Sequence, residues 1–186
     1  MPVYHHFAKH YFQGPYMDFT RGVVERVFPH FLEVLEFEPA SVLDLACGTG
    51  HFAIQQALKG LRVTAVDRSE AFIEIAMNEA AIAGAKVDWH KADIAAFRSL
   101  ERFDCVTSWF DSLNYLVKIE DLANTFKTAA AHLNPGGYFI FDMNTIYGLA
   151  VSWQRQPTFL GQDLPDYLEI CRNSYDYENN LAQMRI

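Results

Sequence analysis

Residues 42–53, VLDLACGTGHFA, decide the fold of this chain. Its first four residues, 42–45, predict a short buried strand, and Gly48 and Gly50 predict a tight loop from which a helix begins at about His51. Asp44 precedes the loop, and Asp67 follows about one βα unit later. This spacing indicates a binding site for a cofactor that carries a nucleoside.

The sequence on either side of this stretch alternates between strand and helix patterns. Helices are expected at about 51–59, 69–84 and 121–133, and the second is the clearest because Ser69 can cap it and Gly84 can end it. Further strands are expected in the stretches RVTAVD (62–67), KVDWHKAD (86–93), FDCVTSWF (103–110) and YFIFDM (138–143). The alternation predicts an α/β fold with a mainly parallel sheet flanked by helices.

The two ends of the chain follow other patterns. Residues 1–40 are expected to be helical, with a break at Pro29, which supplies no backbone donor. Residues 166–186 alternate apolar and polar side chains around the turn ENN (178–180), which predicts an antiparallel hairpin. We therefore divide the chain into a helical segment (1–40), an α/β core (41–147) and a segment that ends in the hairpin (148–186).

The acidic residues of the core fall at the ends of predicted strands, where open parallel sheets bind their ligands. Asp67 can accept hydrogen bonds from both hydroxyls of an unmodified ribose, and Asp93 can accept one from an adenine amino group. Asp44 would be unfavourable beside a pyrophosphate, but it suits a cationic amino-acid moiety. An NAD-dependent oxidoreductase stays open as the alternative, because residues 48–53 also fit G-x-G-x-x-A. The reductase signature YxxxK does not occur in the sequence.

Five stretches resemble, in order and spacing, the motifs of class I S-adenosylmethionine-dependent methyltransferases. They are VLDLACGTG (42–50), VTAVDRSEAFI (63–73), KADIAAF (91–97), FDCVTSWFDSLNYL (103–116) and LNPGGYFIFDMNT (133–145). The aromatic segment YHHFAKHYFQGPYMDF (4–19) is similar to that of bacterial members that act on small molecules. The resemblance implies a Rossmann-like methyltransferase fold with an N-terminal helical lid, S-adenosyl-L-methionine as cofactor, and a small-molecule methyl acceptor.

The resemblance also implies roles for the matching positions. Asp44 and the backbone of Ala46, Cys47, Gly48 and Gly50 would surround the methionine and ribose, and Asp67 would bind the ribose diol. Asp93 and Ile94 would recognise adenine, with Arg68 stacked on the ring or pointing to solvent. Trp109 and Phe110 would line the sulfonium side, and Tyr4, Tyr11 and Tyr16 would close the site. Asp111 and Tyr16 are the candidates for a catalytic role.

The end of the chain departs from the family pattern. The family sheet has two further strands after the fifth, and about 43 residues here follow Met143, which we expect to hold an irregular segment and a hairpin that covers the substrate. We therefore expect a C-terminally truncated chain, in which the hairpin or a second copy covers the fifth strand. A homodimer and a non-catalytic cofactor-binding domain follow from this expectation as alternatives.

The composition of the chain bears on the kind of partner, the cellular location and the metal sites that we expect. The net charge of −8 argues against nucleic acid as a partner, because nucleic-acid binding needs a basic surface. We expect a cytoplasmic protein, because the three cysteines are scattered and the start MPVYHHFAKHYF does not resemble a signal peptide. We also expect that the chain does not cross a membrane, because it has no apolar run near 18 residues. We expect no metal site, because His5, His6 and His10 have no Cys or acidic group to complete one.

Overall fold

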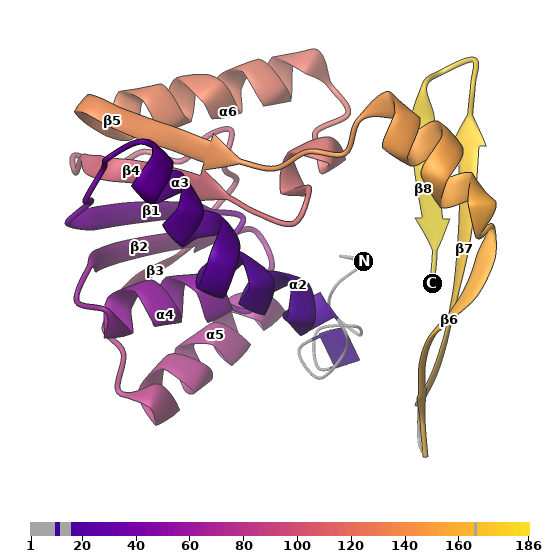
Figure 1. Cartoon of the computed structure of the whole chain (residues 1–186), viewed down its shortest axis with the longest axis horizontal. Helices are drawn as coiled ribbons and strands as arrows, with labels where there is room; N and C mark the ends of the chain where they lie inside the picture. Colours follow the sequence, from indigo (N-terminus) through magenta and orange to yellow (C-terminus); the bar gives the residue numbers. More distant parts are fainter. Residues whose placement is uncertain (1–9, 12–15, 166) are drawn as a thin grey trace. The chain divides into compact units, whose positions relative to one another are not determined.

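The computed structural model describes residues 10–11, 16–165 and 167–186 and shows the predicted parallel sheet (Figure 1). Its five strands lie in the order β3-β2-β1-β4-β5, and every pairing is parallel. The strands are β1 (Ser41–Leu45), β2 (Arg62–Asp67), β3 (Val87–Lys91), β4 (Phe103–Ser108) and β5 (Leu133–Phe141). The Rossmann-like α/β fold predicted from the sequence is confirmed.

Three helices connect strands of this sheet: α4 (His51–Leu58), α5 (Glu70–Ala83) and α6 (Ile119–His132). The ends of α5 form as predicted, since the Ser69 hydroxyl accepts a hydrogen bond from the Phe72 amide at 3.4 Å and Gly84 adopts a left-handed φ of 70°. Residues 92–102 connect β3 to β4 without a helix.

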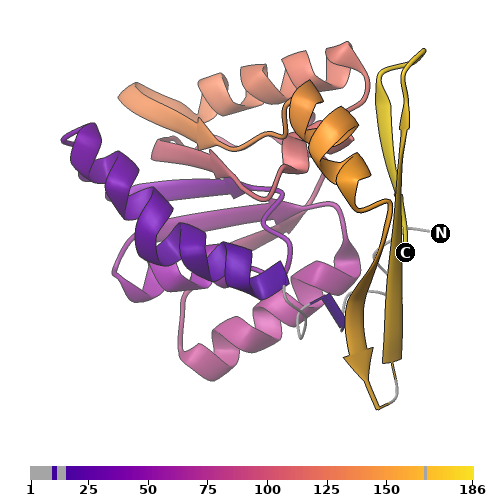
Figure 2. The same cartoon turned by 45° about the vertical axis from the view of Figure 1, so that its right-hand side comes forward.

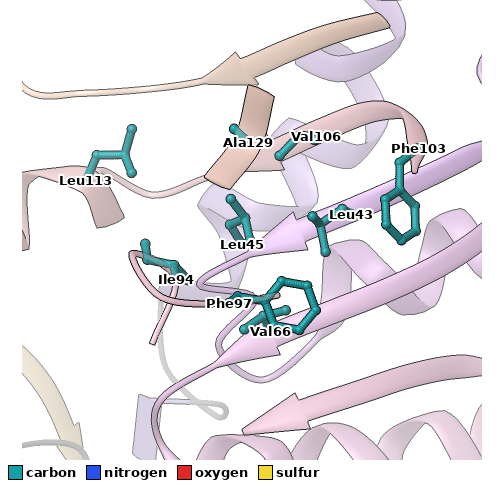
Figure 3. Packing of buried hydrophobic residues seen from close by; sticks show 9 residues of the cluster. All are labelled: Leu43, Leu45, Val66, Ile94, Phe97, Phe103, Val106, Leu113 and Ala129. Atoms are coloured by element: carbon teal, nitrogen blue, oxygen red, sulfur yellow. The ribbon is translucent and has the colours of Figure 1, made fainter. Parts of the chain in front are cut away.

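The sheet has a hydrophobic core on each face. On one face, Leu43 and Leu45 of β1 pack with Phe97, Val106 and Ala129 of α6 (Figure 3). On the other face, the neighbouring β1 residue Val42 packs with residues of α4 and of the N-terminal helices. Because successive side chains of a strand point to opposite faces, β1 contributes to both cores and all five of its residues are buried.

The N-terminal helices lie across the second face (Figure 2). They comprise α2 (Tyr16–Gly22), a π-helical turn η1 (Val23–Val27) and α3 (Phe28–Val34), which follow one another directly. In place of the expected break at Pro29, the chain changes here from the π-helical turn η1 to the α-helix α3. Pro29 lies in the first turn of α3, where an amide donor is not needed. Within the described ranges, no helix combines the length and apolar character needed to cross a membrane.

The chain separates into two compact units, residues 1–142 and 143–186. The second unit holds an antiparallel sheet of order β6-β7-β8, formed by β6 (Thr158–Leu164), β7 (Tyr167–Asp176) and β8 (Leu181–Arg185). It begins with two short helical turns, η3 (Gly148–Ser152) and η4 (Trp153–Arg155). The predicted hairpin is confirmed as β7 and β8. The roles expected of residues 1–40 as a lid and of residues 148–186 as a substrate cover stay predictions.

Strand β6 is not predicted from the sequence, and it lies where we expect an irregular segment. Its pairing with β7 shifts between Leu160 and Gln162, so its alternation is broken in the middle. A side chain on Gly161, at this shift, would overlap the carboxylate of Glu169, which is itself buried on β7. A strand with a bulge and a buried charged neighbour gives no regular apolar pattern in the sequence.

Candidate cofactor and acceptor site

The glycine loop after β1 is held in a left-handed conformation. Ala46, Gly48 and Gly50 have φ values of 60°, 55° and 78°. A side chain on Gly50 would overlap the ring of Trp89 on β3 and would lie 2.8 Å from the Cβ of Ala76 on α5. Gly50 is therefore required both by its backbone angles and by the close packing of the loop against the sheet.

Asp67 fixes the other side of this loop. Its Oδ2 accepts a hydrogen bond from the Gly48 amide at 2.9 Å, and its Oδ1 accepts one from the Ser69 amide at 2.8 Å. Burial raises the pKa of Asp67, and the hydrogen bonds from Ser69 and Gly48 oppose this effect. Each carboxylate oxygen keeps a second lone pair, so the group fits the role of a ribose acceptor expected for S-adenosylmethionine.

Asp44 lies inside the sheet beside the loop, and only 2% of its surface is exposed. The Thr107 hydroxyl donates to its Oδ1 at 2.9 Å, and burial raises the pKa of Asp44 to about 7. No ion pair reaches Asp44 within the part of the chain that the structure describes. A buried carboxylate with one neutral partner suits a cationic ligand such as the amino-acid part of this cofactor.

The sequence analysis did not identify Thr107 as part of the site. Thr107 pairs with Asp44 across β1 and β4, so both side chains emerge on the same face of the sheet. The signal that the sequence offers is a polar residue near the end of the predicted strand FDCVTSWF (103–110).

An aromatic cluster brings together three of the residues predicted for the site. The rings of Tyr11 and Tyr16 stack in parallel with centroids 4.7 Å apart, and both meet Phe110 edge-on at 6.2 Å. Phe19 and Phe72 join them, with ring centroids 4.8 Å from Phe110 and 5.3 Å from Tyr11, respectively. Burial raises the pKa of Tyr11 well above its usual range, and the nearby carboxylates add to this. The cluster therefore lies close to the acidic edge of the sheet.

The turn after β4 is strained. Phe110 and Asp111 are consecutive residues other than glycine with positive φ, at 62° and 46°. Oδ2 of Asp142, which follows β5, accepts a hydrogen bond from the Asp111 amide at 2.8 Å. Oδ1 of Asp142 is buried and has no hydrogen-bond partner among the described residues. Asp111 thus lies at the predicted strand end, in a turn that Asp142 holds.

The residues predicted to recognise adenine lie at the end of β3 and beyond β2. Oδ1 of Asp93 accepts a hydrogen bond from the Ala95 amide at 2.8 Å, and this carboxylate is exposed. The side chain of Ile94 is buried in the core, whereas Arg68 is exposed. The Ala92 amide donates to the Asp67 carbonyl at 3.0 Å and so links the two loops. The adenine-binding roles of Asp93, Ile94 and Arg68 stay predictions.

The positions of Trp109 and Cys47 give less direct support for the roles predicted for them. The Trp109 indole packs in the core, 5.6 Å from Phe52 and 6.3 Å from Phe28 between ring centroids, so its role beside the sulfonium stays a prediction. Burial raises the pKa of Cys47 well above its usual range, which supports a packing role over a nucleophilic one. Tyr4, His5 and His6 lie outside the described residues.

Comparisons with known proteins identify the family. Residues 42–137 match the family model for a methyltransferase domain. The YqeM protein of Bacillus subtilis, whose name classes it among methyltransferases, is 34% identical over 127 residues, which are 68% of this chain and 51% of YqeM. The ubiquinone biosynthesis O-methyltransferase of Rickettsia felis is 24% identical over 166 residues, 88% of this chain and 62% of that enzyme.

A solved structure supports the same family over nearly the whole chain. An S-adenosylmethionine-dependent methyltransferase from Clostridium acetobutylicum superposes with a TM-score of 0.80 and 28% identity, over 97% of this chain and 72% of that one. The chain spans about half the length of YqeM. These matches favour a methyltransferase over the NAD-dependent oxidoreductase that the glycine pattern left open. The chain belongs to the class I S-adenosylmethionine-dependent methyltransferases.

Proposed function

We propose that this protein transfers the methyl group of S-adenosyl-L-methionine to a nitrogen, oxygen or sulfur nucleophile of a small molecule. The observation that carries the proposal is the pair of buried carboxylates on either side of the glycine loop. Asp67 holds the Gly48 amide and keeps capacity for a diol, and Asp44 presents a buried acidic group to a cation. A cofactor with a ribose diol and a positively charged amino acid matches both groups.

The acceptor class rests on charge and on a relative. The net charge of −8 disfavours nucleic acid, and the similar Rickettsia felis protein is by its name an O-methyltransferase of ubiquinone biosynthesis. We infer a small molecule as acceptor on these grounds. We also infer a cytoplasmic location, which the three free cysteines support.

The chain's own residues contribute mainly by positioning and enclosure. The cofactor supplies a methyl group that is already activated, so proximity and orientation can provide about 7–11 kcal/mol of the barrier lowering. The glycine loop and Asp67 would fix the nucleoside end, and the aromatic cluster of Tyr11, Tyr16 and Phe110 would exclude water from the other end. Asp111 and Tyr16 are the groups we propose to receive or orient a proton if the acceptor arrives protonated.

Ligand binding tests the proposal directly. Thermal unfolding is measured with S-adenosylmethionine and S-adenosylhomocysteine, each at about 100 times its Kd, where a bound ligand stabilises by about 2.7 kcal/mol, and with NAD at the same concentration. We expect both adenosyl compounds to raise the Tm and NAD to leave it unchanged. Release of S-adenosylhomocysteine is then followed with a panel of small amines, phenols and thiols. Stabilisation by NAD without stabilisation by S-adenosylhomocysteine would refute the proposal.

A further inference from the structure

The turn after β4 adopts a conformation that its own residues disfavour. Phe110 and Asp111 both have left-handed backbone angles, which residues with a Cβ rarely adopt, and two of them stand in succession. Neither residue can relieve this strain as glycine would. Some other part of the molecule must therefore stabilise the turn.

Asp142 supplies that stabilisation from the neighbouring strand. Its Oδ2 accepts a hydrogen bond from the Asp111 amide at 2.8 Å. The Asp142 amide in turn donates to the Ser108 carbonyl at 3.3 Å, which ties the ends of β4 and β5 together. Hydrogen bonds from backbone amides to a carboxylate are charge-assisted and hence stronger than neutral ones.

The orientation of this turn determines where the Phe110 ring lies. That ring meets Phe19 at 4.8 Å and both Tyr11 and Tyr16 at 6.2 Å, so it is the contact between the sheet edge and the aromatic residues of the N-terminal segment. A turn that relaxed to a right-handed conformation would move the ring away from these partners.

We propose that Asp142 is a positioning residue for the cofactor site: it holds the Phe110–Asp111 turn and thereby fixes the aromatic cluster that encloses the cofactor. This inference rests on the proposed function, because it concerns the same site. It assigns to Asp142 an effect on cofactor affinity that is exerted through Phe110, without a contact to the reacting atoms.

The test compares cofactor affinity with stability in the whole chain. The Kd of S-adenosylhomocysteine is measured by titration calorimetry, and the Tm is measured alongside. We expect Asp142→Ala to weaken binding at least tenfold. Asp142→Asn should stay within about threefold of the unsubstituted protein, because an amide oxygen can accept the same hydrogen bond from the Asp111 amide.

A second substitution separates positioning from general destabilisation. Asp111→Gly in the Asp142→Ala background should recover most of the lost affinity, because glycine adopts positive φ without the steric penalty. The matched control is Asp104→Ala, near the start of β4, which removes a carboxylate that also holds backbone and side-chain donors. This control should lower the Tm and leave the Kd within twofold.

The outcomes distinguish this inference from the proposed function. If the unsubstituted protein does not bind S-adenosylhomocysteine, the proposed function fails. If it binds and Asp142→Ala binds equally well, Asp142 is not a positioning residue. The same conclusion follows if Asp104→Ala weakens binding as much as Asp142→Ala does, or if Asp111→Gly restores nothing.

Discussion

The two edges of the parallel sheet use carboxylates in opposite ways. At the edge where the strands begin, Asp104 is fully satisfied by the Ala40 amide, the Ser41 hydroxyl and the Asn134 side chain, and these hydrogen bonds lower its pKa. At the edge where the strands end, burial raises the pKa of Asp44, Asp67 and Asp142, which have fewer donors. The first arrangement stabilises the chain by itself, whereas the second leaves acceptor capacity for a ligand.

The largest expected effect is an opposite pH dependence of stability at the two edges. Because the pKa of Asp44 is raised to about 7, its contribution is fully present below about pH 4 and is lost as the pH rises through 7. The loss is on the order of 4 kcal/mol, since each pKa unit corresponds to about 1.4 kcal/mol. Asp44→Asn should flatten this slope, which urea unfolding between pH 5 and pH 9 will show.

Asp104 provides the other half of this comparison. Its pKa is lowered, so the stability that it contributes is present above about pH 4 and is lost as the pH falls through its folded value. Asp104→Asn should therefore flatten the acid side of the profile and leave the slope above pH 5 unchanged. An Asp44→Asn protein with the same slope as the unsubstituted chain between pH 5 and pH 8 would contradict the comparison.

The second largest effect is a difference in stability between alanine substitutions of glycines at the two edges. Gly50→Ala should destabilise by about 3 kcal/mol, because the added methyl overlaps Trp89 and crowds Ala76 in addition to the left-handed backbone. Gly60 follows α4 and precedes β2, with a φ of 95° and nothing within 4 Å of its Cβ position. Gly60→Ala should therefore lose only the conformational part, about 1 kcal/mol. Equal losses of unfolding free energy in the two variants would show that the packing of Gly50 contributes nothing.

Asp67→Asn should weaken cofactor binding by about a hundredfold, near 2.8 kcal/mol. The amide keeps the size of the side chain, but it replaces one acceptor oxygen with a donor that faces the Gly48 or the Ser69 amide. The Kd of S-adenosylhomocysteine provides the measurement. Asp104→Asn, the matched substitution at the opposite edge, should leave this Kd within twofold.

The smallest effect is expected at Ala46. Its φ of 60° disfavours a residue with a Cβ, so Ala46→Gly should stabilise the chain by up to about 1 kcal/mol, a rise of a few degrees in Tm. Glycine also widens the choice of conformations in the unfolded chain, which offsets part of this gain. A lower Tm would show that the unfolded-state effect is the larger one.

Much of the fold could be predicted from local sequence because its signals are local. Ser69 and Gly84 mark the ends of α5, the stretch VLDL at 42–45 before the glycine loop marks β1, and the polar turn at 178–180 marks the β7–β8 hairpin. Asp44 and Asp67 could be proposed as site residues for the same reason, since each falls next to a strand end that the pattern itself reveals, and their roles stay predictions.

Other features depend on contacts between distant residues and leave no local signal. The packing of Trp109 against Phe28 and Phe52, which lie far from it in the sequence, could not be predicted. Strand β6 gives no regular pattern because its pairing shifts between Leu160 and Gln162, where Gly161 leaves room for the Glu169 side chain of the neighbouring strand.

The sequence alone determined the order of strands and helices in the α/β core, the glycine loop and the acidic residues at the strand ends, because hydrophobic periodicity and turn chemistry are properties of neighbouring residues. Only the tertiary structure decided which carboxylates have spare acceptor capacity. The capacity of Asp44 depends on Thr107 and on burial between two strands, and that of Asp142 depends on the Asp111 amide, 31 residues earlier. Burial and hydrogen bonding set these carboxylate properties, and both arise when segments distant in sequence pack together.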